Sequence, residues 1–373
     1  MLVPKRDFIG LSGIVHLAAG GETPLLARHL AAFERFAADK ASGLAGRERF
    51  DQTHARVRAH LARMLDMQPT DIALLGSTSE GIAQVLSALD WHTGDTVVTA
   101  ENEFPSGLYA LARLRALGVE LRTVATPSHY LDPDDLIAAC DQRTRLVYLS
   151  HVSFRTGQRL DLERIAVGVH RAGALLLLDA THALGVVPVR GELCDFVVCS
   201  GYKWLLGTHL GILGWNRRQL PGFEPRGVGW RSASDAADPS AIYQLHADAR
   251  RAELGNPNYL DVYILESALE YLAAVGQERI SAYVLQLGGE LRAALIGLGL
   301  EVTTPAARDE RAGNICFLHP RAEELARLAA ERAIQIWGSD GRVRLSVHLY
   351  VTPEDVALLV AALPRLLAEV AEH

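Results

Sequence analysis

The stretch from Leu175 to Trp204, LLLLDATHALGVVPVRGELCDFVVCSGYKW, decides the fold of this chain. It contains two apolar runs, LLLL and FVVC, that predict neighbouring buried strands. Asp179 and His182 follow the first run, and Lys203 follows the second. Ligands of open α/β sheets bind in the crevice outside the carboxyl ends of the strands. We therefore expect an acid and an amine to face one small molecule.

Lys203 is the more informative of these residues. The chain has 37 lysines and arginines together, yet lysine occurs only at Lys5, Lys40 and Lys203. Arginine serves most surface roles but stays protonated, whereas a desolvated lysine can act as an amine nucleophile. The alternative is an ordinary surface lysine. The sparing use of lysine favours a nucleophilic amine at Lys203.

Bulk properties narrow the classes of function. The formal net charge of -7 and the pI near 6.1 argue against nucleic acid as a partner. The sequence shows no signal peptide and no apolar stretch of the ~20 residues needed to span a bilayer, so we expect a cytoplasmic protein without a membrane partner. The four cysteines lack C-x-x-C spacing, and we expect no metal site.

The length of 373 residues predicts two domains, because cores rarely grow beyond about 250 to 300 residues. We expect a large domain over residues 25–258 and a small C-terminal domain over residues 259–373. Residues 1–24 form a segment associated with the small domain. Residues 217–252 lack a clear periodicity of apolar residues, which predicts a loop that lines a site or an interface.

From Ile72 onward, short apolar runs alternate with helical patterns, and helices are also expected over residues 25–39 and 50–65. The predicted strands of the large domain cover residues 72–75, 96–99, 121–124, 146–149, 175–178, 196–199 and 211–215. Strands separated by helices predict right-handed crossovers and a mainly parallel sheet covered on both faces. Strands near Glu301, Ile315 and Val343, with helices between and after them, predict an α+β unit at the C-terminal end.

Residues 76–81, GSTSEG, follow the first predicted strand and begin a helix. Backbone N–H groups, hydroxyls and the helix dipole make such a turn a phosphate cradle, although Ser and Thr also cap helices without a ligand. The turn matches neither the mononucleotide nor the dinucleotide motif. A phosphate cradle, the strand-end Asp179 and Lys203 together match the needs of pyridoxal 5'-phosphate (PLP), which are a phosphate anchor, a carboxylate for the ring nitrogen and an amine for the aldehyde.

With these motifs the sequence resembles the class V aminotransferase superfamily, which includes cysteine desulfurases, kynureninases and isopenicillin N epimerases. The resemblance covers residues 76–355 and implies the α/β fold of fold-type I PLP-dependent transferases, with a large, mainly parallel sheet domain and a small α+β C-terminal domain. It implies that Lys203, in an S-x-[HY]-K segment, forms the Schiff base with PLP. Asp179 and His182 would contact the cofactor ring. The phosphate contacts that the resemblance implies are Thr78, Ser79, Ser200 and Tyr202.

Two aromatic residues place the resemblance nearer to kynureninases than to desulfurases. Phe104, in an E-F-P-S segment, stands where desulfurases carry a histidine stacked on the ring, and Phe154 stands where they usually carry asparagine. Trp230 lies in a segment partly similar to the G-W-x-G-H segment of kynureninases and is a candidate substrate contact. His151 is another candidate contact, with a satisfied core histidine as the alternative.

The C-terminal part of the resemblance implies how the substrate is bound. Arg344, in V-R-L-S, resembles the family's arginine for the α-carboxylate, which a planar guanidinium binds in a bidentate manner. Arg342 is expected to be solvated. Asn256 stands where the neighbouring subunit of a homodimer usually contributes a threonine to the phosphate, so it is a candidate cofactor contact from the partner.

These residues predict a homodimeric PLP enzyme that acts on an α-amino acid, with Lys203 also serving as the base for the α-proton. Residues 336–342 contain no cysteine, which argues against a persulfide-forming desulfurase. We favour a β-elimination or β-cleavage lyase of the cysteine-lyase or kynureninase type. A class V aminotransferase and an amino-acid epimerase are alternatives, because all begin with the same proton abstraction. More remote alternatives are a nicotinamide oxidoreductase and a non-catalytic PLP-fold protein.

Overall fold

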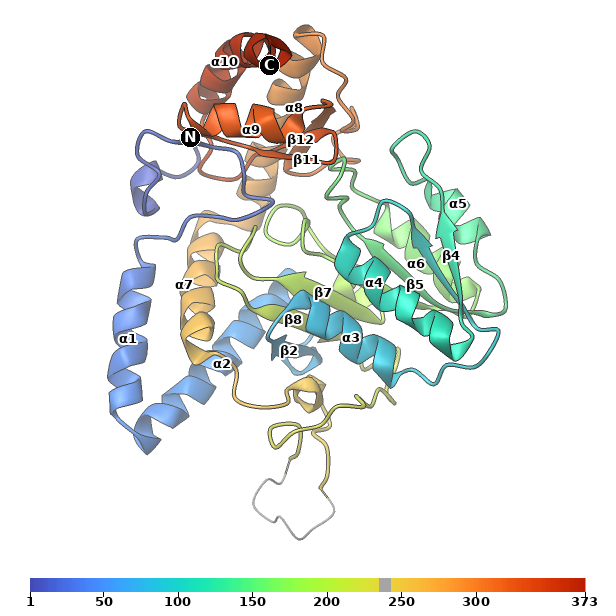
Figure 1. Ribbon diagram of the computed structural model, residues 1–373. Helices are drawn as coiled ribbons and strands as arrows, with labels where there is room; N and C mark the ends of the chain where they lie inside the picture. The colour runs from blue at the N-terminus through green and yellow to red at the C-terminus, as the bar shows by residue number, and fades with distance from the viewer. Residues whose placement is uncertain (235–242, 373) are drawn as a thin grey trace.

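A seven-stranded sheet forms the centre of the computed structural model, which describes residues 1–234 and 243–372. Neighbouring strands are parallel, except that β8 runs antiparallel to both β2 and β7 (Figure 1). The α/β prediction with a mainly parallel sheet is confirmed. In spatial order the strands are β2 (Ile72–Leu75), β8 (Gly211–Trp215), β7 (Phe196–Ser200), β6 (Leu175–Asp179), β5 (Thr144–Ser150), β3 (Thr96–Ala100) and β4 (Glu120–Val124).

The central strands are unbroken apolar runs because helices cover both faces of the sheet. Successive residues of β6 belong to different hydrophobic cores, one on each face of the sheet. Leu177 belongs to the core formed with α3 (Thr78–Ala88) and α4 (Pro105–Arg113), whereas Leu176 and Leu178 belong to the core that contains α6 (Leu162–Arg171). The short α5 (Pro133–Ala138) packs beside α6. All three leucines are fully buried.

Three long helices pack side by side along one flank of the sheet (Figure 1). They are α1 (His29–Ala41), α2 (Leu44–Met64) and α7 (Tyr259–Val275). Compared with the predicted ranges, α2 begins six residues earlier and α1 begins four residues later. Gly43, with φ of 62°, turns the chain between α1 and α2 in a conformation that favours glycine. The predicted start of α2 was wrong because apolar periodicity does not reveal this corner.

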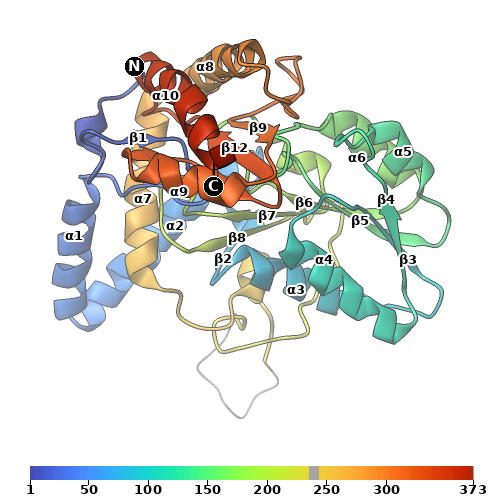
Figure 2. The same ribbon diagram turned by 45° about the horizontal axis from the view of Figure 1, so that its top comes forward.

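The C-terminal elements form a smaller antiparallel sheet, and Figure 2 shows its helices gathered above the main sheet. Its strands, in spatial order, are β11 (Trp337–Ser339), β12 (Arg342–Ser346) and β9 (Asn314–Leu318). Its helices are α8 (Gln277–Gly297), α9 (Ala322–Ala330) and α10 (Pro353–Glu372). The predicted small α+β unit is thus present. The predicted domain boundaries at residues 24 and 258 stay a prediction.

The predicted strand near Glu301 is wrong. Val302 makes only an isolated bridge to Phe317. The next residues leave the sheet because the Thr304 hydroxyl accepts the backbone N–H of Cys316, at 2.7 Å, in place of a ladder partner. Single turns of 3₁₀ helix complete the described elements. These are η1 (Lys5–Asp7), η2 (Pro69–Asp71), η3 (Leu114–Leu117), η4 (Gly191–Leu193) and η5 (Ala249–Ala252).

The N-terminal segment runs between the two sheets. Its strand β1 (Val15–His16) pairs in parallel with β10 (Ile334–Gln335), and Ala18 makes a bridge to Ser346 of β12. At its end, the Thr23 hydroxyl lies 2.8 Å from the carbonyl oxygen of Tyr202 and 3.1 Å from that of Lys203. The segment therefore contacts both the small sheet and the backbone that carries the proposed nucleophile.

Candidate active site

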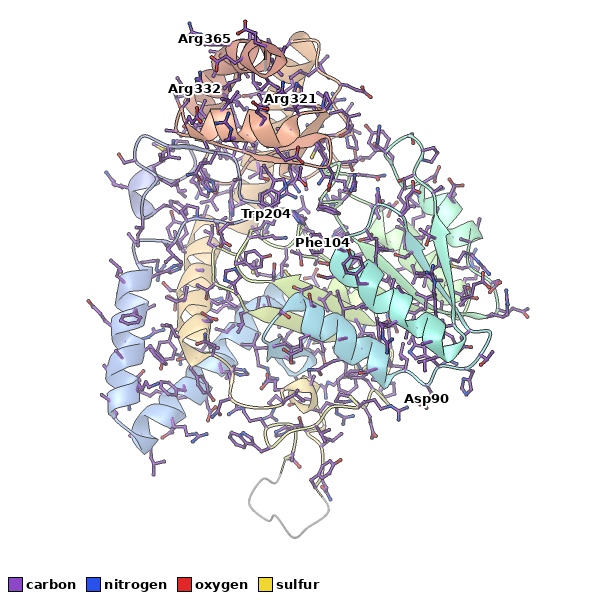
Figure 3. All side chains as sticks on the ribbon, viewed as in Figure 1. Asp90, Phe104, Trp204, Arg321, Arg332 and Arg365 are labelled. Carbon is purple, nitrogen blue, oxygen red and sulfur yellow. The ribbon has the colours of Figure 1, made fainter. Side chains whose placement is uncertain are left out.

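Strands β2, β3, β5, β6 and β7 share one direction, so their carboxyl ends meet at one edge of the sheet. A cavity of about 220 Å³ lies at this edge. Figure 3 shows Phe104 and Trp204 between the main sheet and the small-sheet elements, and Phe104 lines the cavity. Eight residues expected to bind the cofactor line the cavity, namely Thr78, Ser79, Phe104, Asp179, His182, Ser200, Tyr202 and Lys203.

Lys203 projects into this cavity from the loop after β7 and is only 6 % exposed. Its Nζ lies 3.3 Å from His182 Nε2, and 5.5 Å and 5.4 Å from the ring centroids of Phe104 and Tyr202. Burial, together with the positive charge of Arg344, lowers the pKa of Lys203 to about 8. The neutral, nucleophilic form of its amine is therefore far more populated near neutral pH than in a lysine of ordinary pKa.

Asp179 ends β6 inside the same cavity, and its carboxylate is already oriented. One oxygen accepts the backbone N–H of Thr181 at 2.8 Å, and the other accepts the hydroxyl of Tyr148 at 3.3 Å. Burial raises the pKa of Asp179. Glu103 is buried nearby and accepts two hydrogen bonds from Ser150, and burial raises its pKa to about 7. A buried carboxylate gains most from a cationic partner, such as a protonated ring nitrogen.

The turn between β2 and α3 fits a phosphate group. The helix α3 begins at Thr78, and Ser77 caps it by accepting the backbone N–H of Glu80 at 3.1 Å. Thr78 Oγ1 and Ser200 Oγ are buried without a hydrogen-bond partner in the part of the chain that the structure describes. Buried hydroxyls are normally paired. One orphaned hydroxyl at the N-terminus of α3 and another at the end of β7, both lining the cavity, therefore suit an anionic ligand.

Arg344 lies on β12 behind Phe154, which itself lines the cavity, and the arginine is 4 % exposed. Its Nη1 donates to the carbonyl oxygen of Phe154 at 3.3 Å, and its guanidinium carbon lies 5.3 Å from the ring centroid of Trp337. A Cβ at Gly20 would lie 3.0 Å from Arg344 Nε, so the N-terminal segment covers the guanidinium closely. Burial lowers the pKa of Arg344 to about 10. Arg344 thus supplies a dehydrated positive charge on the small-sheet side.

The cavity combines an amine, an oriented carboxylate and a phosphate cradle, and the family comparison agrees with this chemistry. Residues 24–359 match the model of the family described as aminotransferase class-V. The chain belongs to the class V aminotransferase family. Its cofactor is PLP, which the residues of the cavity fit.

Named relatives of this class V enzyme fall into two groups. A probable cysteine desulfurase of Methanothermobacter thermautotrophicus is 28% identical over 81% of this chain and 80% of its own length. The kynureninase of Geobacillus thermodenitrificans is 27% identical over 84% of this chain and 78% of its own. These similar values do not support the expectation that the chain is nearer to kynureninases than to desulfurases.

Solved structures show the same fold. A complex of a cystine C–S lyase with cysteine persulfide aligns with a TM-score of 0.89 and 24% identity, covering 96% of this chain and 98% of that chain. The apo cysteine desulfurase of Thermococcus onnurineus aligns with a TM-score of 0.87 and 22% identity, covering 97% and 96%. The fold-type I architecture expected from the sequence is confirmed.

Three further candidate residues of this class V enzyme lie away from the cofactor cavity. His151 is buried and lines a separate cavity of about 430 Å³, although its backbone N–H donates to the carbonyl oxygen of Asp179 at 2.9 Å. Trp230 is 51 % exposed and lies beneath the guanidinium of Arg47. Asn256 accepts a hydrogen bond from the same arginine at 3.3 Å. Within one subunit, none of the three side chains lines the cofactor cavity.

The prediction that Arg342 is solvated is wrong. Arg342 is 3 % exposed, and its guanidinium carbon lies 5.0 Å from the ring centroid of Phe154. It is buried because β12 is the middle strand of its sheet, and all five of its residues are covered. Two arginines in a short segment are typical of an exposed strand. Only the position of β12 in the middle of its sheet shows that Arg342 is buried.

Sequence analysis missed residues that orient the site of this class V enzyme. Asn314 Nδ2 lies 3.0 Å from His182 Nδ1, and its oxygen accepts the hydroxyl of Ser346 at 2.8 Å. The ring of His209 stacks on Tyr202 with centroids 4.5 Å apart. A polar residue that begins the apolar strand NICFL is a signal that could have identified Asn314. The pattern around His209 carries no comparable signal.

Proposed function

We propose that this class V enzyme acts on an α-amino acid as a β-elimination or β-cleavage lyase. The observation that carries the proposal is the buried amine of Lys203, which shares one cavity with the carboxylate of Asp179 and the orphaned hydroxyls of Thr78 and Ser200. The named relatives, a probable cysteine desulfurase and kynureninases, support a lyase.

When bound, PLP supplies an aldehyde and an electron-withdrawing ring. The hydroxyls of Thr78 and Ser200, with the N-terminus of α3, would hold its phosphate, and Asp179 would stabilise a positive charge on the ring nitrogen. Lys203 Nζ would hold the cofactor at rest and later take the α-proton of the substrate. His182 Nε2, at 3.3 Å from Nζ, would orient the amine through a hydrogen bond.

Arg344 would bind the α-carboxylate, because a guanidinium forms paired hydrogen bonds with a carboxylate. Cys316 is fully buried in β9, and residues 336–342 contain no cysteine that could receive sulfur. This arrangement favours the release of a β-substituent over transfer of sulfur to a cysteine of the chain. Transamination and epimerisation remain the competing outcomes, since both start from removal of the same proton.

A panel of amino acids tests the lyase proposal. We expect the PLP-loaded enzyme to convert one or more β-substituted amino acids to pyruvate or alanine while its cofactor spectrum is regenerated. Pyruvate, alanine and keto acids are measured by chromatography, and the cofactor by absorbance. Formation of a pyridoxamine spectrum with the matching keto acid, or inversion at the α-carbon without any β-fragment, would contradict the lyase assignment.

The lowered pKa of Lys203 predicts how the uptake of PLP depends on pH. The neutral amine is the reactive form. Because the pKa is about 8, this form predominates only above about pH 8. We therefore expect the rate of PLP incorporation into cofactor-free protein to rise steeply up to about pH 8 and to level off above it. Stopped-flow absorbance measures the rate. A rate that still climbs steeply well above this pH would show that burial does not lower this pKa.

We further propose a homodimer in which the surface of Trp230 and Asn256 faces the cavity of the partner subunit. Exposure of Trp230, and the shared contact of both residues with Arg47, support this proposal.

Within residues 1–234 and 243–372, no helix has the length and apolar character to cross a membrane. The cytoplasmic location stays a prediction.

A further inference from the structure

Two arginines on one strand are buried without an ion-pair partner in the part of the chain that the structure describes. Arg342 and Arg344 are two residues apart on β12, so their side chains leave the same face of the strand. They are 3 % and 4 % exposed, and neither forms an ion pair with a carboxylate among the residues that the structure describes. Burying a charge without a partner is costly. A binding site for anions would explain why both charges are kept.

The unused donors of the two arginines point to a ligand. Arg342 Nε and Nη1, and Arg344 Nε, are buried without a hydrogen-bond partner within the described ranges. The bond that Arg344 makes to the carbonyl oxygen of Phe154 leaves most of its donors unused. Burial lowers the pKa of both side chains, as expected for guanidinium charges that lack compensation.

Phe154 connects both arginines to the cofactor cavity. Its ring lines that cavity and contacts Phe104 edge-on, with centroids 5.1 Å apart. The same ring lies 5.0 Å from the guanidinium carbon of Arg342, and its carbonyl oxygen accepts Arg344. A substrate held between the cofactor and Arg344 would thus have the ring of Phe154 beside it and Arg342 beyond it.

Arg342 also lines a second cavity, of about 450 Å³, which is separate from the cofactor cavity. The carboxylates of this cavity are engaged elsewhere. Glu101 accepts both the backbone N–H and the hydroxyl of Thr126, and Asp340 lies 3.9 Å from Arg155. Neither acid forms an ion pair with Arg342 in the described part of the chain, although the charge of Asp340 acts on it from a distance.

We propose that the amino-acid substrate carries a second carboxylate on its side chain, and that Arg342 binds this group while Arg344 binds the α-carboxylate. The inference rests on the proposed function, since it places the α-carboxylate at Arg344. Residues two apart on a strand are separated by about 6.6 Å, a span that suits an acid of the size of aspartate or glutamate. The ring of Phe154 would pack against the methylene groups between the two carboxylates.

Calorimetric titration of the PLP-loaded protein tests this inference without a chemical reaction. The ligands are glutarate and its monoamide, which has the same shape but only one carboxylate. We expect the wild-type enzyme to bind glutarate about tenfold or more tightly than the monoamide, because charge-assisted hydrogen bonds are stronger than neutral ones. In Arg342→Gln this preference should disappear while the affinity for the monoamide is kept. Arg344→Gln should weaken the binding of both ligands.

Two further variants control for folding. Arg342→Met replaces a buried charge by an apolar side chain of similar length, a change that buried sites often tolerate, and it should also lose the preference for glutarate. Arg332→Gln removes an exposed pair with Glu369 on the small-sheet side (Figure 3), and it should leave both affinities unchanged. Thermal unfolding confirms that each variant is folded.

The outcomes separate this inference from the proposed function. A wild-type enzyme that takes up PLP and reacts with amino acids, but shows no preference for glutarate, overturns the second carboxylate alone. Equal losses for both ligands in Arg342→Met also overturn it, because Arg342 would then act on the α-carboxylate or on the fold. A protein that does not take up PLP at all overturns the proposed function instead.

Discussion

Lys203→Ala should abolish covalent attachment of PLP and lower kcat by about 10⁴-fold or more. The variant loses both the amine that holds the cofactor and the base that takes the α-proton, and a general base alone contributes roughly 10²-fold to 10⁴-fold. Borohydride reduction followed by mass spectrometry measures attachment. We expect the wild-type peptide that contains Lys203 to gain the mass of the cofactor and the variant to gain none.

Lys40→Ala is the matched control, because Lys40 is an exposed lysine on α1. It should keep the cofactor spectrum and the activity of the wild-type enzyme. Covalent PLP in Lys203→Ala, attached to another lysine with activity retained, would disprove the assignment of Lys203.

Asp179→Asn should lower kcat by about 10² to 10³ while leaving the fold intact. The amide keeps the shape of the carboxylate, and its oxygen can still accept the backbone N–H of Thr181. It cannot stabilise a positive charge on the ring nitrogen, and removing one preorganised electrostatic contact commonly has an effect of this size. Steady-state kinetics with the best substrate of the panel measures kcat, and PLP absorbance shows whether the ring environment changes.

Tyr148→Phe is the control for this prediction. Tyr148 donates a hydrogen bond of 3.3 Å to Asp179, so the variant removes an orienting contact but keeps the charge. It should retain most of the activity. If Asp179→Asn and Tyr148→Phe have equal and small effects, the charge of Asp179 is not used in the reaction.

Much of the site could be predicted because its residues follow the ends of apolar strands. The run before Asp179 is unbroken since both faces of the sheet are buried, and the segment before Lys203 has the same property. Parallel strands bring their carboxyl ends together whatever the sequence of the intervening helices. Thus local pattern was sufficient to place Thr78, Asp179 and Lys203 in one cavity.

Contacts across the small sheet could not be predicted in this way. Arg342 was expected to be solvated because its charge suggests a surface, but its strand is covered on both sides. Asn314 contacts His182 although the two are far apart in the chain, and no local period encodes such a pairing. In the proposed homodimer, Trp230 and Asn256 would contact the cavity of a second subunit, which a single chain does not contain.

The N-terminal segment has a consequence for the order of events during synthesis. Val15 pairs with Ile334, and Lys5 forms an ion pair of 2.5 Å with Asp355, so these residues leave the ribosome long before their partners are synthesised. Contacts that close such long loops form late. The large sheet can assemble before them, whereas the final placement of Thr23 against the Lys203 loop must await the last strands.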